Sequence, residues 1–257
     1  MMNKELLKAY WHTEEQYAKI KGWDFSYLKN RFDSGENKLP WDFCQIIKQY
    51  LNSESRLLDI DTGGGEFLLS LQHAYALTSA TEGYAPNVAF CKEKFSKLGI
   101  DFHEMTDVSN MPFDSQEFDM IMNRHGRYDI NELFRVLKSN GLFLTQQVGE
   151  YNDWELVKKL LPNAKRKFKG HCLASQLKLF QNAGFEILEQ GEAYCPIRFY
   201  DTGALVWFAK VIEWEFVDFS VDNCFENLLM IEQEIQEKGF VSGEIHRFYL
   251  VAKKKDW

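Results

Sequence analysis

A turn of three consecutive glycines is the feature that most constrains the fold of this chain. It lies in the stretch "RLLDIDTGGGEFLLSL", residues 56–71, between an apolar run and an amphipathic segment. The apolar run 56–61 predicts a buried strand, and residues 66–73 predict a helix. A glycine-rich turn at such a junction lets the backbone approach a ligand closely. This arrangement is typical of α/β proteins, which bind ligands where their parallel strands end.

Strands and helices alternate along most of the chain. This alternation predicts parallel βαβ units in a single sheet that is covered by helices on both faces. Further strands are expected at 76–82, 101–106, 118–125, 142–149, 185–194 and 246–254, and helices at 41–51, 86–99, 130–141 and 173–184. The fold class is therefore α/β, with a Rossmann-like sheet of seven strands.

The two ends of this pattern carry additions. Residues 1–50 read as an N-terminal helical extension or lid, and residues 51–257 as the main domain. A second addition, at about 195–239, reads as a helical segment inserted before the last strand. The aromatic residues of the N-terminal part predict either a lid over a ligand or ordinary core packing. They are Tyr10, Trp11, Trp23 and Phe25.

The charge balance narrows the classes of partner. The net charge of the 257 residues is −8, which argues against a broad surface for nucleic acid. The basic runs at 165–169 and 253–255 are short and are read mainly as solvated faces. We therefore expect a small-molecule substrate, and the sequence sets no oligomeric state.

Cysteine usage and hydropathy indicate a cytoplasmic protein. The five cysteines are scattered and form no CxxC pair, as expected for reduced thiols and not for disulfides or a zinc site. The N-terminus is charged and lacks the apolar segment of a signal peptide. No apolar run approaches the roughly 20 residues that span a bilayer. We expect neither a metal nor a membrane.

Two common ligand loops fit the glycine turn poorly. A dinucleotide loop has the pattern G-x-G-x-x-G, and Gly63 and Gly65 match its first two glycines. The third position falls on Leu68, where glycine would allow close packing of helix on strand. A P-loop is also excluded, because no Gly-Lys-Ser/Thr follows.

The turn resembles motif I of the class I S-adenosylmethionine-dependent methyltransferases, in their type 11-like branch. That motif reads D-x-G-x-G-x-G, and residues 59–65 read "DIDTGGG". Three more signals follow in register: Glu82 at the end of the second strand, "TDVSNMPFDSQEFD" at 106–119 and "ELFRVLKSNGLFLTQQ" at 132–147. The resemblance implies a sheet whose last strand is antiparallel.

The same resemblance implies S-adenosylmethionine as cofactor and S-adenosylhomocysteine as product. In the family, the acidic residue matching Glu82 holds the ribose hydroxyls. The residue matching Asp107 reaches the adenine amine, and the backbone amide matching Val108 reaches the adenine ring. The cofactor-binding residues predicted in this way are Asp59, Asp61, Gly63, Gly64, Gly65, Glu82, Asp107, Val108 and Asn123.

The methyl acceptor is expected beyond the fourth strand. His125 is the candidate catalytic residue, either as a base that deprotonates the acceptor or as a group that orients it, and the alternative is a surface histidine. The insertion resembles the segment that covers the substrate in related enzymes. The predicted substrate residues are Arg124, Arg198, Tyr200 and Asp201, for which a surface charge or internal lid packing is the alternative.

Asp61 departs from the family pattern. It replaces a glycine at the position where the methionine part of the ligand should pass. A carboxylate here can face away, accept a hydrogen bond from the ligand's ammonium group, or obstruct the pocket. The first function hypothesis is methyl transfer to a small molecule. The alternatives are an rRNA or tRNA methyltransferase, and a non-catalytic methyltransferase-like protein weakened by Asp61.

Overall fold

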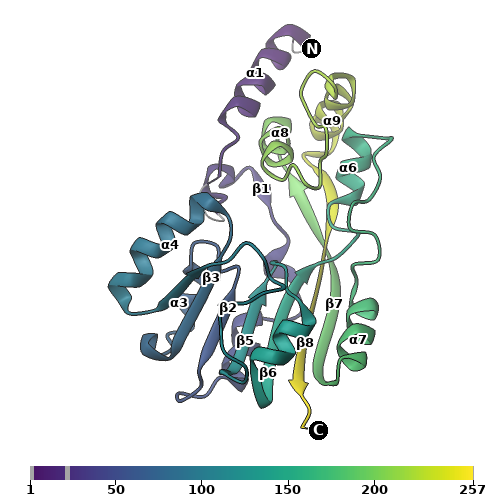
Figure 1. The fold of residues 1–257 in the computed structure, drawn as a ribbon. Helices are drawn as coiled ribbons and strands as arrows, with labels where there is room; N and C mark the ends of the chain where they lie inside the picture. Colours follow the sequence, from purple (N-terminus) through teal and green to yellow (C-terminus); the bar gives the residue numbers. More distant parts are fainter. Residues whose placement is uncertain (1–2, 21–23, 257) are drawn as a thin grey trace.

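A computed structural model describes residues 3–20 and 24–256, so Trp23 lies outside the described residues. Its core is one eight-stranded sheet with the strand order β1-β7-β8-β6-β5-β2-β3-β4 (Figure 1). The strands are β1 (Phe32–Asp33), β2 (Leu57–Ile60), β3 (Thr78–Glu82), β4 (Asp101–Glu104), β5 (Phe118–Arg124), β6 (Leu137–Val148), β7 (Phe185–Phe199) and β8 (Val241–Lys254).

The direction of the strands confirms the predicted Rossmann-like class. Strands β4, β3, β2, β5 and β6 pair in parallel, whereas β8 is antiparallel to both β6 and β7. The last strand is therefore antiparallel, as expected. The two-residue β1 adds an eighth strand at the edge, antiparallel to β7. The strand order reverses between β2 and β5, and this switch point is where such sheets bind ligands.

Helices cover both faces of the sheet. The α-helices of the described residues are α1 (Lys4–Tyr17), α2 (Phe43–Tyr50), α3 (Glu66–Ser70), α4 (Ala85–Leu98), α5 (Ile130–Val136), α6 (Trp154–Leu160), α7 (Leu173–Asn182), α8 (Thr202–Val211) and α9 (Phe225–Lys238). Helices α2, α3 and α4 pack with one set of strand residues, which includes Leu57. Helices α5 and α7 pack with the alternate set, which includes Leu58. This alternation is the period of two expected of strands buried on both faces.

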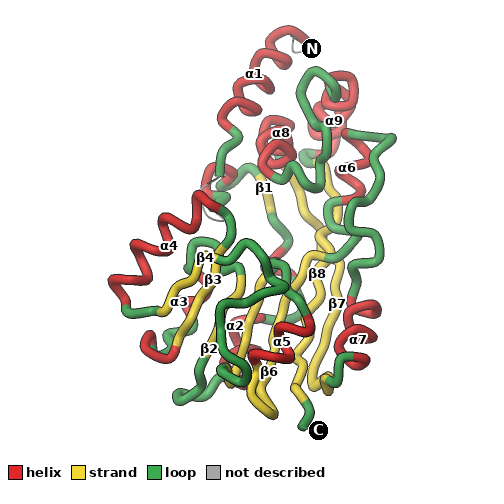
Figure 2. Tube along the Cα trace, viewed as in Figure 1, coloured by secondary structure: helices red, strands yellow, loops and turns green. Residues whose placement is uncertain are grey.

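A cap lies beyond the carboxyl ends of the parallel strands. Helices α1, α6, α8 and α9 gather there (Figure 1) and share one apolar cluster that includes Trp11, Trp207 and Leu228. The long strands β7 and β8 reach up to this cap (Figure 2). Helix α1 packs on α8, while α2 packs on the sheet.

Four predicted boundaries are wrong. The helix expected at 130–141 ends at Val136, because Leu137 takes an extended conformation and pairs with Phe118 of β5. The insertion begins after Phe199 and not at Cys195, because β7 continues along β8. The last strand begins at residue 241 for the same reason. The helix expected at 66–73 ends at Ser70.

Arg31 connects three parts of the cap. Its guanidinium lies 3.0 Å from Glu14 on α1 and 2.6 Å from Asp201, which precedes α8. It also donates a hydrogen bond to the Tyr10 hydroxyl at 2.9 Å. The Glu14 side chain is only 6% exposed, so its charge depends on this partner.

We expect Arg31→Gln to lower the free energy of unfolding by about 2–4 kcal/mol, because it leaves a buried carboxylate unpaired. The control is Arg56→Gln, which removes a more exposed ion pair with Glu117 and should cost less than about 1 kcal/mol. Denaturant unfolding measures both. Equal losses for the two variants would contradict the role of Arg31.

Candidate functional site

Two positions of the glycine loop adopt a backbone conformation that favours glycine. Gly63 and Gly65 have φ values of 65° and 78°, in the left-handed region that favours glycine. A Cβ atom on Gly65 would lie 2.3 Å from the Phe95 ring of α4. The loop therefore turns sharply from β2 into α3 and packs closely on α4.

Glu82 fastens this loop from the next strand. One carboxylate oxygen accepts a hydrogen bond from the Gly63 amide at 2.8 Å. The other accepts bonds from the amides of Gly83 and Tyr84, both at 2.8 Å. The carboxylate is thus fixed beside the glycine loop at the carboxyl edge of the sheet. Two carbonyls of the loop are held from α4, Gly63 by the Cys91 thiol at 3.0 Å and Gly64 by Lys94 at 2.9 Å.

The loop is surrounded by acidic groups. Burial raises the pKa of Asp59 to about 7, and the nearby charges of Asp61 and Glu82 add to this effect. Burial also raises the pKa of Asp61, with a further contribution from Glu82. Carboxyl groups that raise one another's pKa favour a ligand that carries positive charge. Within the described residues, no group of three or more His, Cys, Asp or Glu side chains is arranged to hold a metal ion.

Asp61 adopts the conformation for which the family uses glycine. Its φ is 57°, and aspartate is one of the few residues that tolerate this region. Its carboxylate accepts a hydrogen bond from the Arg127 backbone amide at 3.0 Å. The side chain is therefore directed at the loop that follows β5.

Asp107 and Val108 lie in the loop after β4, near the same edge. The exposed Asp107 carboxylate accepts hydrogen bonds from the amide and the hydroxyl of Ser109, at 2.9 and 2.7 Å. These bonds shape the turn and lower the pKa of Asp107. Val108 packs against the core on the α5 face. A turn-forming role and adenine recognition are both compatible with these positions.

Asn123 is completely buried at the end of β5. Its amide nitrogen donates to the Ile60 carbonyl at 3.0 Å. Its amide oxygen accepts bonds from Thr145 at 3.3 Å and from Gln147 at 2.6 Å. These partners bridge β2, β5 and β6, so Asn123 fixes the switch point at which the site is built.

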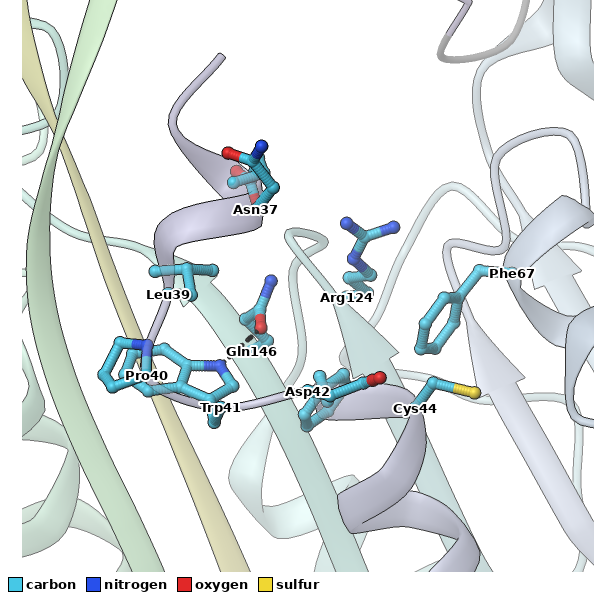
Figure 3. A pocket seen from close by; sticks show the side chains of 11 residues that line it. Asn37, Leu39, Pro40, Trp41, Asp42, Cys44, Phe67, Arg124 and Gln146 are labelled. Carbon is cyan, nitrogen blue, oxygen red and sulfur yellow. Dashed lines mark hydrogen bonds between the residues drawn. The ribbon is translucent and has the colours of Figure 1, made fainter. Parts of the chain in front are cut away.

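A cavity of about 670 Å³ opens beside this edge. Its walls come from the segment that leads into α2, from α3, and from the ends of β5 and β6 (Figure 3). Its volume lies within the range of small-molecule sites. It is lined by Glu36, Asn37, Leu39, Pro40, Trp41, Asp42, Phe43, Cys44, Phe67, Arg124 and Gln146.

His125 lies next to this cavity and is held neutral. Burial lowers its pKa well below the usual value, and the charges of Arg247 and Arg124 lower it further. Trp41 Nε1 donates to Gln146 Oε1 at 2.8 Å, which directs the Gln146 amide nitrogen to His125 Nε2 at 3.2 Å. The lone pair of Nε2 is therefore engaged, and the proton resides on Nδ1.

The predicted substrate residues separate into two places. Arg124 lines the cavity, whereas Arg198, Tyr200 and Asp201 do not. Asp201 caps α8 through the Ala204 amide at 2.8 Å and pairs with Arg31. The Arg198 guanidinium lies 4.7 Å from the Phe240 ring centroid. The structure thus places Arg124 and His125 at the end of β5, near the glycine loop, and leaves Arg198 on β7 and Asp201 at the start of α8.

Several lining residues were not expected from the sequence. Trp41 and Asp42 lie in the break before α2, Phe67 lies one residue into α3, and Gln146 lies near the end of β6. The "PWDF" stretch at 40–43 predicts the start of a helix. Its neighbouring residues in the sequence do not indicate that it folds over the end of β6.

Comparison with known proteins agrees with this geometry. A family model described as "Methyltransferase domain" matches residues 58–145. Phthiotriol/phenolphthiotriol dimycocerosates methyltransferase of Mycobacterium tuberculosis is 31% identical over 88 residues. That match covers 32% of this chain and 32% of the relative, so the chain spans about a third of the relative's length.

Solved structures share the fold. A protein of Bacillus halodurans C-125 described as a candidate methyltransferase has a TM-score of 0.57 and 18% identity, covering 84% of this chain and 99% of its own. A SAM-dependent methyltransferase of Methanosarcina mazei has a TM-score of 0.51 and 16% identity, covering 82% and 97%. The chain is therefore similar to methyltransferases over residues 58–145, and it shares the fold of these solved structures over most of its length.

The structure contains no helix, within the residues that it describes, that is long and apolar enough to cross a membrane.

We expect Gly65→Ala to destabilise the protein by about 2–5 kcal/mol, because it combines left-handed strain with a collision at Phe95. The matched control is Gly99→Ala, where φ is 77° but no atom lies within 4 Å of the added Cβ. That variant should lose about 1–2 kcal/mol from strain alone. Denaturant unfolding measures the difference, and equal losses would show that Phe95 does not constrain the loop.

We expect His125 to stay neutral, with its proton on Nδ1, in the range where a free histidine becomes charged, because burial and the charges of Arg247 and Arg124 lower its pKa well below the usual value. Long-range ¹H–¹⁵N NMR of the imidazole reports both the charge and the tautomer. A His125 signal that titrates near pH 6.5 would contradict this assignment.

Proposed function

We propose that this protein transfers a methyl group from S-adenosylmethionine to a small-molecule acceptor. One observation carries the proposal: the Gly63 amide and the Glu82 carboxylate are joined at 2.8 Å at the switch point of the sheet. The loop offers backbone to the ligand, and Glu82 offers carboxylate oxygens to a pair of hydroxyl groups. The acidic groups around the loop suit a positively charged sulfonium donor.

Each predicted cofactor residue receives a role in this proposal. Gly63, Gly64 and Gly65 form the surface on which the ligand lies, and Glu82 holds the ribose. Asp107 and Val108 recognise the adenine, while Asn123 fixes the strand ends. Asp59 and Asp61 provide negative charge near the methionine part of the ligand.

The bound donor would supply an activated methyl group on a good leaving group. The protein then has to align the acceptor with the donor and exclude water, and alignment alone is worth on the order of 7–11 kcal/mol in well-oriented systems. The neutral His125, held by Gln146, is better suited to orient an acceptor than to remove a proton from it. The cavity beside the loop provides the space for the acceptor.

Isothermal titration with S-adenosylhomocysteine tests the proposal. We expect binding with a micromolar Kd, equivalent to about −8 kcal/mol. Glu82→Gln should weaken it by at least about tenfold, because a charged acceptor of hydroxyl bonds is lost. NAD, the ligand of the alternative glycine loop, is the negative control. Folded protein that takes up no S-adenosylhomocysteine at millimolar concentration would overturn the proposal.

A second candidate is a methyltransferase-like protein whose cofactor binding is impaired by Asp61. It is favoured by a partly buried carboxylate at a position where the family has glycine. We expect instead that Asp61 attracts the ligand's ammonium group, so that Asp61→Gly weakens S-adenosylhomocysteine binding about three- to tenfold. The affinity should rise with pH as Asp61 ionises, because the ammonium binds the charged form. A gain of affinity in Asp61→Gly would support the impaired reading.

A further inference from the structure

Arg124 places its guanidinium in the cavity without an ion pair to any residue that the structure describes. Its side chain is half-buried at the end of β5, with the guanidinium 4.9 Å from the Phe67 ring centroid. Figure 3 shows it directed into the space between Asn37 and Phe67. Its Nε atom is buried, and no described residue accepts a hydrogen bond from it. None of the described residues forms an ion pair with Arg124 either.

The acidic groups of the cavity are already engaged elsewhere. Glu36 accepts a hydrogen bond from Arg247 at 2.7 Å. Asp42 caps α2 by accepting a bond from the Gln45 amide at 3.2 Å. Asp61 does not line the cavity and is directed at the Arg127 amide. A guanidinium with a buried unpaired donor, next to carboxylates that are occupied, favours an anionic ligand.

The walls around Arg124 favour an apolar body on that ligand. Leu39, Pro40 and Trp41 line one side of the cavity, and Phe67 lines the other (Figure 3). A planar guanidinium over an aromatic ring is held in position for the two-bond recognition of a carboxylate. The residues Gly63, Gly65 and Glu82 do not line this cavity, so the site lies beside the cofactor loop.

We propose that the methyl acceptor is a small molecule with a carboxylate attached to a flat apolar body, and that Arg124 binds this carboxylate. The proposal rests on the proposed function, since it assigns the acceptor of that reaction. Arg124 acts as a specificity residue: it anchors the acid group, and the apolar walls then direct the rest of the molecule towards the donor.

The test uses the full chain saturated with S-adenosylhomocysteine. Phenylacetate and indole-3-acetate are the probes, their uncharged amides are the matched ligands, and binding is measured by ligand-observed NMR. We expect the carboxylates to bind at least about tenfold more tightly than the amides. Arg124→Gln should remove this preference, and Arg124→Lys should keep part of it, since lysine retains the charge but not the fork.

The control variant is Arg56→Gln, which removes an arginine 5.7 Å from the Phe118 ring centroid, at the opposite end of β2. It should leave the preference unchanged. Affinities for S-adenosylhomocysteine and 5′-methylthioadenosine, which lacks the amino-acid part, are measured for each variant. Thermal unfolding verifies that each variant is folded.

Equal binding of acids and amides by the wild-type chain would overturn the proposal. So would a loss in Arg124→Gln of affinity for S-adenosylhomocysteine but not for 5′-methylthioadenosine, because Arg124 would then hold the donor's carboxylate. If the protein binds S-adenosylhomocysteine but Arg124→Gln leaves the preference for acids over amides unchanged, the proposed function stands and this inference is wrong. If the protein binds the acids through Arg124 but does not bind S-adenosylhomocysteine, the proposed function is wrong. The bound acid is then not a methyl acceptor.

Discussion

The hydrogen bond from the Gly63 amide to the Glu82 carboxylate is the interaction on which the site depends. It joins the loop after β2 to the end of β3, next to the point between β2 and β5 where the strand order reverses. The loop can make this bond because two of its residues take left-handed conformations that glycine allows. A side chain at Gly65 would push the loop away from α4, and the carboxylate would lose its partner. Local backbone chemistry therefore sets the place where a ligand can lie.

The charged groups around the glycine loop determine which ligands it favours. Asp59, Asp61 and Glu82 converge on the loop, and burial raises the pKa of both aspartates. At the end of β5, burial lowers the pKa of His125, and the charges of Arg247 and Arg124 lower it further. The acidic groups around the loop would match a cationic donor, and Arg124, which lines the cavity, would match an anionic acceptor.

The sequence was sufficient for the parts of the structure that follow from local pattern. The glycine turn, Glu82 at a strand end and the alternation of strands with helices led to the correct fold class. The end of the helix near residue 136 was missed, because Leu137 is extended and buried in the core and does not add another helical turn. The cavity was missed for a related reason. Trp41 and Gln146 form its wall but are 105 residues apart, and only tertiary packing brings them together. Likewise, Asp201 forms an ion pair with Arg31 in the cap of helices. The residues next to Asp201 in the sequence do not indicate this role.

The most direct measurement is a crystal structure of the protein with S-adenosylhomocysteine. The account predicts the ligand at the carboxyl edge of β2 and β3, with its ribose hydroxyls on Glu82, its amino-acid part near Asp61 and its sulfur facing the cavity that Arg124 lines. A ligand bound elsewhere on the chain, or a Glu82 carboxylate that makes no contact with the ribose, would contradict it.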